Sequence, residues 1–251
     1  IIIMKIAIIG TGYVGLVTGT CLSEIGNSVI CVDKDSTKLE KLTSGIMPIY
    51  EPGLENLVSK NISAGKLKFT NSIEDAIADV DVIFLALPTP PLEDGSADVS
   101  SVIEVANQIG KHMMNYKVIV NKSTVPVGTA FKVKQVISSH YKGDFDVISN
   151  PEFLREGEAI NDFMYPNRII IGCESQNAKE VMESVYNYFL LKGVNLLFMD
   201  VSSAELTKYA ANSFLATKIS FMNEISQICE KLGADVDMVR IGIGSDDRIG
   251  S

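Results

Sequence analysis

A glycine-rich turn near the start of the sequence has the residue types and spacing of a dinucleotide-binding site. Gly10, Gly12 and Gly15 form a G-x-G-x-x-G directly after an apolar run and before a helical pattern. In this motif the first glycine permits a tight turn, the second lets backbone amides approach a pyrophosphate, and the third lets helix and strand pack closely. The N-terminus of the helix also favours an anion. A P-loop is excluded, because no Lys-Ser or Lys-Thr pair follows the glycines.

Asp33 extends this motif toward a specific cofactor. It stands 18 residues after Gly15, at the end of the next predicted strand, where a carboxylate can accept hydrogen bonds from a ribose diol. Its charge would repel the 2′-phosphate of NADP, so we predict NAD as the cofactor. A glycine turn without a ligand is the alternative interpretation, and Asp33 counts against it.

Two further polar segments follow predicted strands. Leu-Pro-Thr-Pro-Pro occupies residues 87–91, and Lys-Ser-Thr-Val-Pro-Val-Gly occupies residues 122–128. Ligands of doubly wound sheets bind at the carboxyl ends of the strands, so hydroxyls and rigid prolines at these places can line a nicotinamide pocket. Ordinary turn chemistry is the alternative for each segment taken singly. Their shared location favours the functional interpretation.

Charged residues cluster in a third segment, Asn-Pro-Glu-Phe-Leu-Arg-Glu-Gly at residues 150–157, which also follows a predicted strand. If this segment forms a helical turn, Glu152 and Glu156 project on one side with Arg155 close by. A solvated, salt-bridged turn is the alternative.

Lys208 and Asn212 are four residues apart near the start of a long helical pattern, so they share one helix face. A lysine in such a place is usually a surface charge. Small or apolar side chains at positions 209–211 surround Lys208, however, and this environment suits a partly buried cation.

The elements that must position these residues alternate between short β-branched runs and helical patterns, which predicts an α/β fold with a doubly wound, Rossmann-type parallel sheet. We expect Gly26 to end the first helix, Ser36 to cap the second, and Asp98 or Ser100 to cap a helix that ends near His112. The expected strands are Lys5–Ile9, Ser28–Asp33, Leu67–Thr70, Val80–Leu87, Val118–Asn121, Asp146–Ser149, Arg168–Gly172 and Asn195–Met199. Residues 1–200 are predicted to form this NAD-binding domain.

A long helix is predicted to follow the sheet, because residues 203–231 contain no Gly or Pro and are apolar at helical spacing. A shorter helix is expected at 235–243. The apolar positions form two stripes, wider than one neighbouring element would cover. One has Leu215, Ile219, Met222, Ile225, Cys229 and Leu232, and the other has Phe214, Phe221 and Ile228. We therefore expect residues 201–251 to hold a central long helix and the start of a dimerisation region, with a homodimer through the helix.

Composition excludes several classes of protein. The 251 residues carry a formal charge of −9 and are 46% hydrophobic, which argues against disorder and against a nucleic-acid partner. No apolar run is long enough to span a membrane and no signal peptide is recognisable, so we expect a cytoplasmic protein without a membrane partner. The cysteines are scattered and each is expected to be buried, with neither a metal site nor a disulfide framework: Cys21, Cys31, Cys173 and Cys229.

Taken together, these motifs resemble the UDP-glucose dehydrogenases within the nucleotide-sugar dehydrogenases. The resemblance covers nearly the whole chain from Met4 onward. It rests on residues 4–15, 94–100, 122–128, 150–157, 165–172, 205–223 and 244–250. The segment at 150–157 points to UDP-glucose as the substrate, while GDP-mannose or another nucleotide sugar remains an alternative.

The resemblance implies roles for individual residues in a two-step, NAD-dependent oxidation of the sugar C6 alcohol to a carboxylate. Lys208 and Asn212 would stabilise negative charge at C6, Glu152 would be the general base for a hydrolytic water, and Thr124 would help to place that water. The implied cofactor-binding residues are Gly10, Gly12, Tyr13, Val14, Gly15, Asp33, Lys38, Pro88, Thr89, Ser123, Thr124 and Glu156. The implied substrate-binding residues are Glu152, Phe153, Leu154, Arg155, Glu156, Lys208, Asn212 and Arg248, the last reaching a neighbouring subunit.

The resemblance also implies what to expect beyond these motifs. In the family, the nucleophilic cysteine and a C-terminal UDP-binding domain follow the segment that resembles 244–250. We expect both to be absent from this chain, and the chain by itself to be inactive. Two other interpretations stay open: a hydroxyacid dehydrogenase, against which the 150–157 segment argues, and a cofactor-binding module without catalysis.

Overall fold

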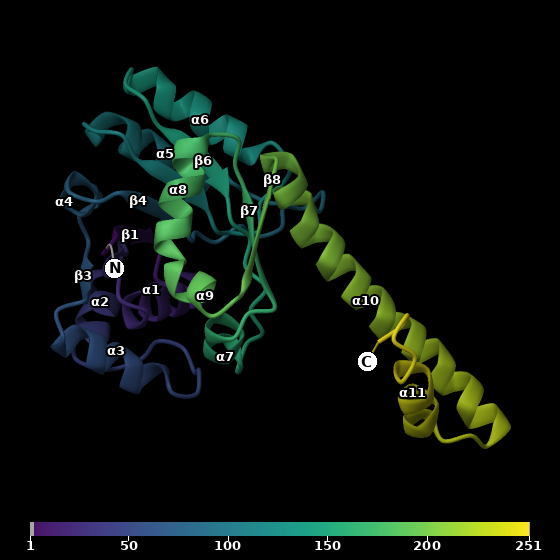
Figure 1. Cartoon of the computed structure of the whole chain (residues 1–251). Helices are drawn as coiled ribbons and strands as arrows, with labels where there is room; N and C mark the ends of the chain where they lie inside the picture. The colour runs from purple at the N-terminus through teal and green to yellow at the C-terminus, as the bar shows by residue number, and fades with distance from the viewer. Residues whose placement is uncertain (1–2, 251) are drawn as a thin grey trace. The chain divides into compact units, whose positions relative to one another are not determined.

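The computed structural model describes residues 3–250, and its centre is a sheet of eight strands in the order β3-β2-β1-β4-β5-β6-β7-β8. All eight predicted strands form (Figure 1). Their bounds are β1 Lys5–Ile9, β2 Ser28–Val32, β3 Leu67–Thr70, β4 Val82–Leu85, β5 Val118–Asn121, β6 Asp146–Ser149, β7 Arg168–Gly172 and β8 Asn195–Met199. The chain turns from one side of the sheet to the other between β1 and β4, which is the switch point where such folds bind ligands.

Helices cover both faces of this sheet (Figure 1). One core packs under α1, α3, α7 and α8, and a second packs under α4, α5 and α6. β4 and β5 are buried along their whole length, as expected of strands covered on both faces. The helices before β8 are α1 Tyr13–Glu24, α2 Ser36–Thr43, α3 Leu54–Ser63, α4 Ile73–Ala78, α5 Ser100–His112, α6 Thr129–His140, α7 Ala159–Met164, α8 Gln176–Val185 and α9 Asn187–Leu191.

The sheet departs from the predicted parallel arrangement at one junction. β6 and β7 meet through a single antiparallel pairing of Ser149 with Gly172, whereas the other pairings are parallel. The reason lies in the connection, because α7 has six residues and spans about 9 Å, too little to carry the chain back along a strand.

Gly172 brings the following long helix close to this junction. A Cβ atom at this position would lie 2.5 Å from the Cβ of Ala204 and 2.8 Å from the Cα of Val201. Only glycine allows so close an approach, so the first turns of α10 (Val201–Leu232) pack against the end of β7.

Two of the predicted helix caps need correction. Gly26 ends the first helix as expected, with a φ of +112°. Ser36 is the first residue of α2 and not its cap, because the Asp35 carboxylate accepts a hydrogen bond from Lys38 N at 3.1 Å. The N-cap of α5 is Val99, and Asp98 accepts from Ser100 N at 2.8 Å one residue earlier.

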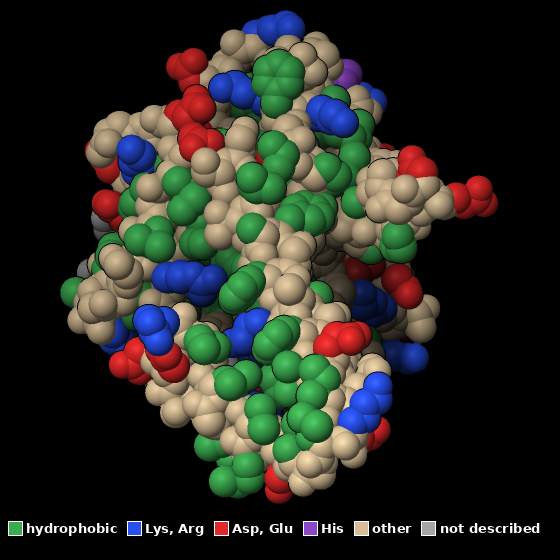
Figure 2. Space-filling view, turned by 90° about the vertical axis from the view of Figure 1, so that its right-hand side faces the viewer, with side chains coloured by type: hydrophobic (Ala, Val, Ile, Leu, Met, Phe, Trp, Pro, Cys, Tyr) green, Lys and Arg blue, Asp and Glu red, His purple; other side chains and the backbone are tan. Residues whose placement is uncertain are grey.

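The chain divides into two compact units, residues 1–208 and 209–251. The second unit contains most of α10 and α11 (Val236–Gly244). Much of the predicted apolar face is exposed there, including Phe214 and Ile219 at 64% and 65%, and Figure 2 shows hydrophobic side chains on these helices. The four cysteines are buried and free, as predicted.

Two searches concern classes of ligand and environment. Among residues 3–250, no helix combines the length and apolarity of a membrane span. The same part of the chain holds no group of three or more His, Cys, Asp or Glu side chains suited to a metal ion.

Candidate active site

The glycine turn at the end of β1 is shaped by steric demands that differ at each glycine. Gly10 has a φ of +103°, and a Cβ there would lie 2.4 Å from Ala86 O. A Cβ at Gly15 would lie 2.0 Å from Gly10 O, so only glycine lets α1 pack against the turn. A Cβ at Gly12 would meet nothing within 4 Å. The space above Gly12, at the N-terminus of α1, is therefore open and suits a pyrophosphate.

Asp33, at the end of β2, is held beside this turn by hydrogen bonds from two residues. Its Oδ2 accepts from Thr11 N at 3.1 Å, from Thr11 Oγ1 at 2.6 Å and from Lys38 Nζ at 2.8 Å. Burial alone would raise the pKa of Asp33, but these bonds outweigh it and lower the pKa to about 2. The carboxylate is thus charged at neutral pH, and its Oδ1, which accepts from Asp35 N, has capacity for a ribose hydroxyl.

The segments after β4 and β5 are bonded to each other. Thr89 Oγ1 donates to Thr124 O at 2.9 Å, and Ser123 Oγ donates to Leu87 O at 2.7 Å. Thr89, Ser123 and Thr124 are half-buried, while Pro88 is exposed. The two predicted nicotinamide segments therefore form one surface at the carboxyl edge of the sheet.

Lys208 and Glu152 form a buried ion pair. Lys208 Nζ lies 2.7 Å from Glu152 Oε1, and the two side chains are 8% and 11% exposed. Glu152 Oε2 accepts from Leu154 N at 2.6 Å. The predicted burial of Lys208 is confirmed, and this pairing differs from a solvated surface salt bridge because both charges are removed from water.

The helical turn expected at residues 150–157 does not form. The segment is irregular up to Arg155, and a turn follows at 156–158. Glu152 points to Lys208, Glu156 is exposed, and Arg155 pairs with Asp162 at 2.6 Å. The physical reason is the buried pair itself, since a carboxylate drawn to Lys208 cannot share a helix face with Glu156.

Tyr13 connects the glycine turn to this irregular segment. Gly157 N donates to Tyr13 Oη at 2.8 Å, and Tyr13 Oη donates to the buried carboxylate of Glu51. Glu51 also accepts from Gly157 N at 2.9 Å. Burial, with Glu51 adding to it, raises the pKa of Tyr13 to about 12. Val14, next along α1, packs half-buried against the core under that helix.

The other predicted residues have less defined surroundings. Phe153 and Leu154 are half-buried, and Arg168 lies over the Phe153 ring at 4.3 Å. Asn212 and Arg248 belong to the second unit, where Arg248 pairs with Asp246 at 2.6 Å.

Several residues of this region were not predicted. Glu205 is buried and accepts from Gly128 N at 2.6 Å and Ala130 N at 3.0 Å, which caps the start of α6. Its spacing of three from Lys208 could have placed it on the same helix face. Glu51 had no such signal, because its partners lie far away in the sequence. Lys122 and Asn150 belong to the predicted motifs, but no role was assigned to either.

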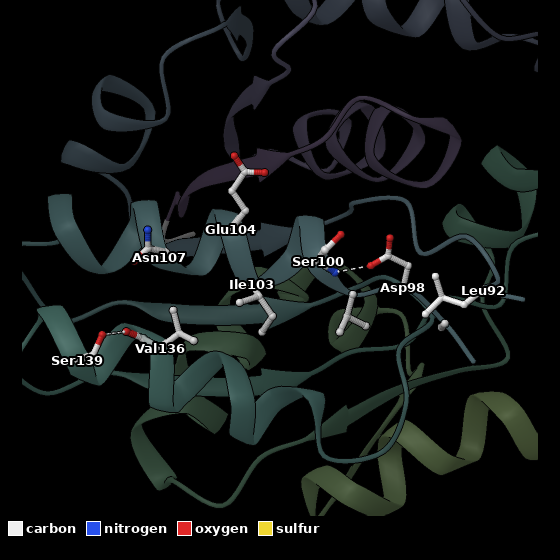
Figure 3. A pocket seen from close by; sticks show the side chains of 10 residues that line it. Leu92, Asp98, Ser100, Ile103, Glu104, Asn107, Val136 and Ser139 are labelled. Atoms are coloured by element: carbon white, nitrogen blue, oxygen red, sulfur yellow. Dashed lines mark hydrogen bonds between the residues drawn. The ribbon is translucent and has the colours of Figure 1, made fainter. Parts of the chain in front are cut away.

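A wide hollow of about 730 Å³ lies elsewhere, between α5, α6 and the segment that leads into α5 (Figure 3). Its described lining includes Asp98 and Glu104 and no Lys or Arg. An acidic lining disfavours a diphosphate, and none of the predicted site residues lies in it. The dinucleotide therefore fits the glycine turn better than this hollow.

Comparison with known sequences decides the family. The profile of the NAD binding domain of the UDP-glucose/GDP-mannose dehydrogenase family matches residues 4–190, and the profile of its central domain matches residues 202–251. The chain belongs to the UDP-glucose/GDP-mannose dehydrogenase family. NAD as the cofactor is confirmed by this match.

Members of the family resemble the chain over nearly all its length. The UDP-glucose 6-dehydrogenase TuaD of Bacillus subtilis (strain 168) is 52% identical over 98% of this chain and 53% of its own length. The structure of a UDP-glucose dehydrogenase from Pyrobaculum islandicum matches with a TM-score of 0.94 and 39% identity, over 99% of this chain and 58% of that one. The GDP-mannose dehydrogenase from Pseudomonas aeruginosa matches with a TM-score of 0.91 and 35% identity, over 97% and 57%. The chain spans about half the length of the curated relatives it matches.

Proposed function

We propose that the protein oxidises the C6 alcohol of UDP-glucose to a carboxylate, giving UDP-glucuronate with two molecules of NAD reduced. The observation that carries this proposal is the buried pair of Lys208 and Glu152 in a chain of this family. NAD, when bound, accepts hydride. The residues of the chain bind the cofactor, hold the sugar and manage its protons.

The glycine turn and Asp33 hold the cofactor in this proposal. The open space at Gly12 lets the backbone amides at the start of α1 reach the pyrophosphate. Asp33 Oδ1 accepts a hydrogen bond from the adenosine ribose, and its Oδ2 stays bound to Thr11 and Lys38. The joined surface of Thr89, Ser123 and Thr124 lines the nicotinamide side.

Lys208 and Glu152 serve the reacting carbon. An ammonium in a site that is shielded from water stabilises the negative charge that develops on the C6 oxygen when the alcohol loses its proton. Glu152 is a carboxylate held next to that ammonium, and it takes the proton of the hydrolytic water in the later step. Asn212 supplies a second donor to the oxygen, and Thr124 helps to place the water.

The names of the relatives favour UDP-glucose over other nucleotide sugars. Three curated relatives at 52%, 49% and 47% identity are UDP-glucose 6-dehydrogenases. GDP-mannose is the second candidate, and the 35% identical GDP-mannose dehydrogenase structure supports it.

We further propose a homodimer formed through α10 and a cytoplasmic location. The exposed apolar side chains of α10 favour association, because a soluble surface rarely leaves so many together. Four free, buried cysteines are consistent with a reducing compartment.

A turnover assay tests the substrate. The chain is prepared as given and also joined to the part of the B. subtilis relative that it does not span, and NADH is measured with UDP-glucose or GDP-mannose. We expect the joined protein to form two NADH per UDP-glucose and its Lys208→Met variant to form none. NADH from GDP-mannose alone, or no turnover of UDP-glucose by a joined protein that binds NAD, would overturn the proposal.

A further inference from the structure

A second buried lysine lies close to Glu152 and has no part in the chemistry described above. Lys122 follows β5 directly and is 5% exposed. Its Nζ donates to Asn150 Oδ1 at 3.1 Å, the one acceptor found for it within residues 3–250. A buried ammonium is costly unless it is bonded, so its place in the site calls for an explanation.

Asn150 is the residue through which Lys122 acts. It is 1% exposed and begins the irregular segment that carries Glu152. Its Nδ2 donates to Ile170 O at 2.7 Å, and its Oδ1 accepts from Tyr186 Oη at 2.6 Å as well as from Lys122. Asn150 is therefore fixed from three sides, and Glu152, two residues later, starts from a rigid base.

A cavity of about 50 Å³ adjoins this group and is lined by Lys122, Asn150, Glu152 and Tyr186 among others. One water needs roughly 10–15 Å³, so water can take the remaining N–H groups of Lys122. Burial lowers the pKa of Lys122 to about 8, with the charge of Glu152 opposing that effect and Lys208 adding to it. The three charges thus act on one another.

We propose that Lys122 is a positioning residue, which fixes Asn150 and, through it, holds the Glu152 carboxylate against Lys208 and Leu154 N. Lys208 binds one carboxylate oxygen and the Leu154 amide binds the other. Lys122 keeps the segment at the height where both bonds can form. This inference concerns the geometry of the site and does not depend on the identity of the sugar.

Hydrogen exchange at the Leu154 amide tests the proposal in the chain as it stands, because this amide is protected only while Glu152 accepts its bond. Lys122→Met removes the charge and the bond to Asn150. Lys117→Met is the matched control, since Lys117 is 2% exposed at the other end of β5 and donates to Val80 O at 2.7 Å. After correction for global stability, we expect Leu154 to exchange about tenfold faster in Lys122→Met, the scale of one charge-assisted bond, and at the parent rate in Lys117→Met. Equal rates at Leu154 in Lys122→Met and parent would overturn the proposal.

The parent chain provides a second measurement if Lys122→Met does not fold. Corrected for base catalysis, exchange at Leu154 should rise about threefold as Lys122 loses its charge near pH 8, because charged hydrogen bonds are stronger than neutral ones. The Ala130 amide, which is bonded to Glu205, should show no such step. A flat profile at Leu154 would overturn the proposal. Neither measurement requires turnover, so failure here is distinguishable from failure of the proposed substrate.

Discussion

Lys208 Nζ and Glu152 Oε1 lie 2.7 Å apart in a nearly water-free setting, although 56 residues separate them in the sequence. The pair joins the first turns of α10 to the segment after β6. Glu205, one turn earlier on α10, joins the same helix to the start of α6. The beginning of α10 thus holds two of the segments that form the site.

Glu152→Gln should leave the Lys208 ammonium buried without its counter-charge. Loss of one partner of a buried pair costs about 3–5 kcal/mol, so we expect the free energy of unfolding in urea to fall by roughly that amount. Glu158→Gln, an exposed change in the same segment, is the control and should alter stability by less than about 0.5 kcal/mol. Equal stabilities for the two variants would show that the pair contributes nothing to the fold.

Alanine at Gly12 and at Gly15 should separate cofactor binding from folding. A Cβ at Gly12 meets nothing within 4 Å, so Gly12→Ala should keep the melting temperature but weaken NAD, because the methyl group occupies the space of the pyrophosphate. A Cβ at Gly15 lies 2.0 Å from Gly10 O, so Gly15→Ala should lower the melting temperature as well. Calorimetric titration with NAD and thermal unfolding check both. Full NAD affinity in a folded Gly12→Ala variant would place the cofactor elsewhere.

Asp33→Ala should weaken NAD by about 1–3 kcal/mol, the scale of a hydrogen bond to a charged group. Glu40→Ala, an exposed change on α2, should leave the affinity unchanged. Isothermal titration of the folded chain gives both constants. If Asp33→Ala bound NAD as tightly as the parent, Asp33 would have no contact with the ribose.

Stability should rise with pH in the range where Lys122 titrates. Burial lowers its folded pKa from 10.5 to about 8, so between these values the unfolded chain binds more protons than the folded one. The gain relative to Lys122→Met should begin near pH 8, end near pH 10.5, and total about 3 kcal/mol at most. Urea unfolding of both proteins at a series of pH values measures the difference. A difference that is constant across the series would mean that Lys122 has its ordinary pKa in the folded state.

Local patterns were sufficient for much of this protein. Each strand contains its own β-branched run, and the glycine turn contains its own steric requirements, so all eight strands and the roles of Gly10 and Gly15 in packing could be predicted from neighbouring residues. The burial of Lys208 followed in the same way from the small residues beside it. These features depend on interactions within a few positions along the chain.

Other features were decided only when distant segments met. The antiparallel pairing of Ser149 with Gly172 depends on how far α7 can carry the chain, and the irregular path of residues 150–157 depends on the attraction of Glu152 to Lys208. The buried cluster of Lys122, Asn150 and Tyr186 joins positions up to 64 residues apart, and Glu51 reaches Gly157 across 106. Partners at such separations leave no periodic signal in a sequence, because each contact is set by the packing of helices and strands and not by the neighbours of the residue along the chain.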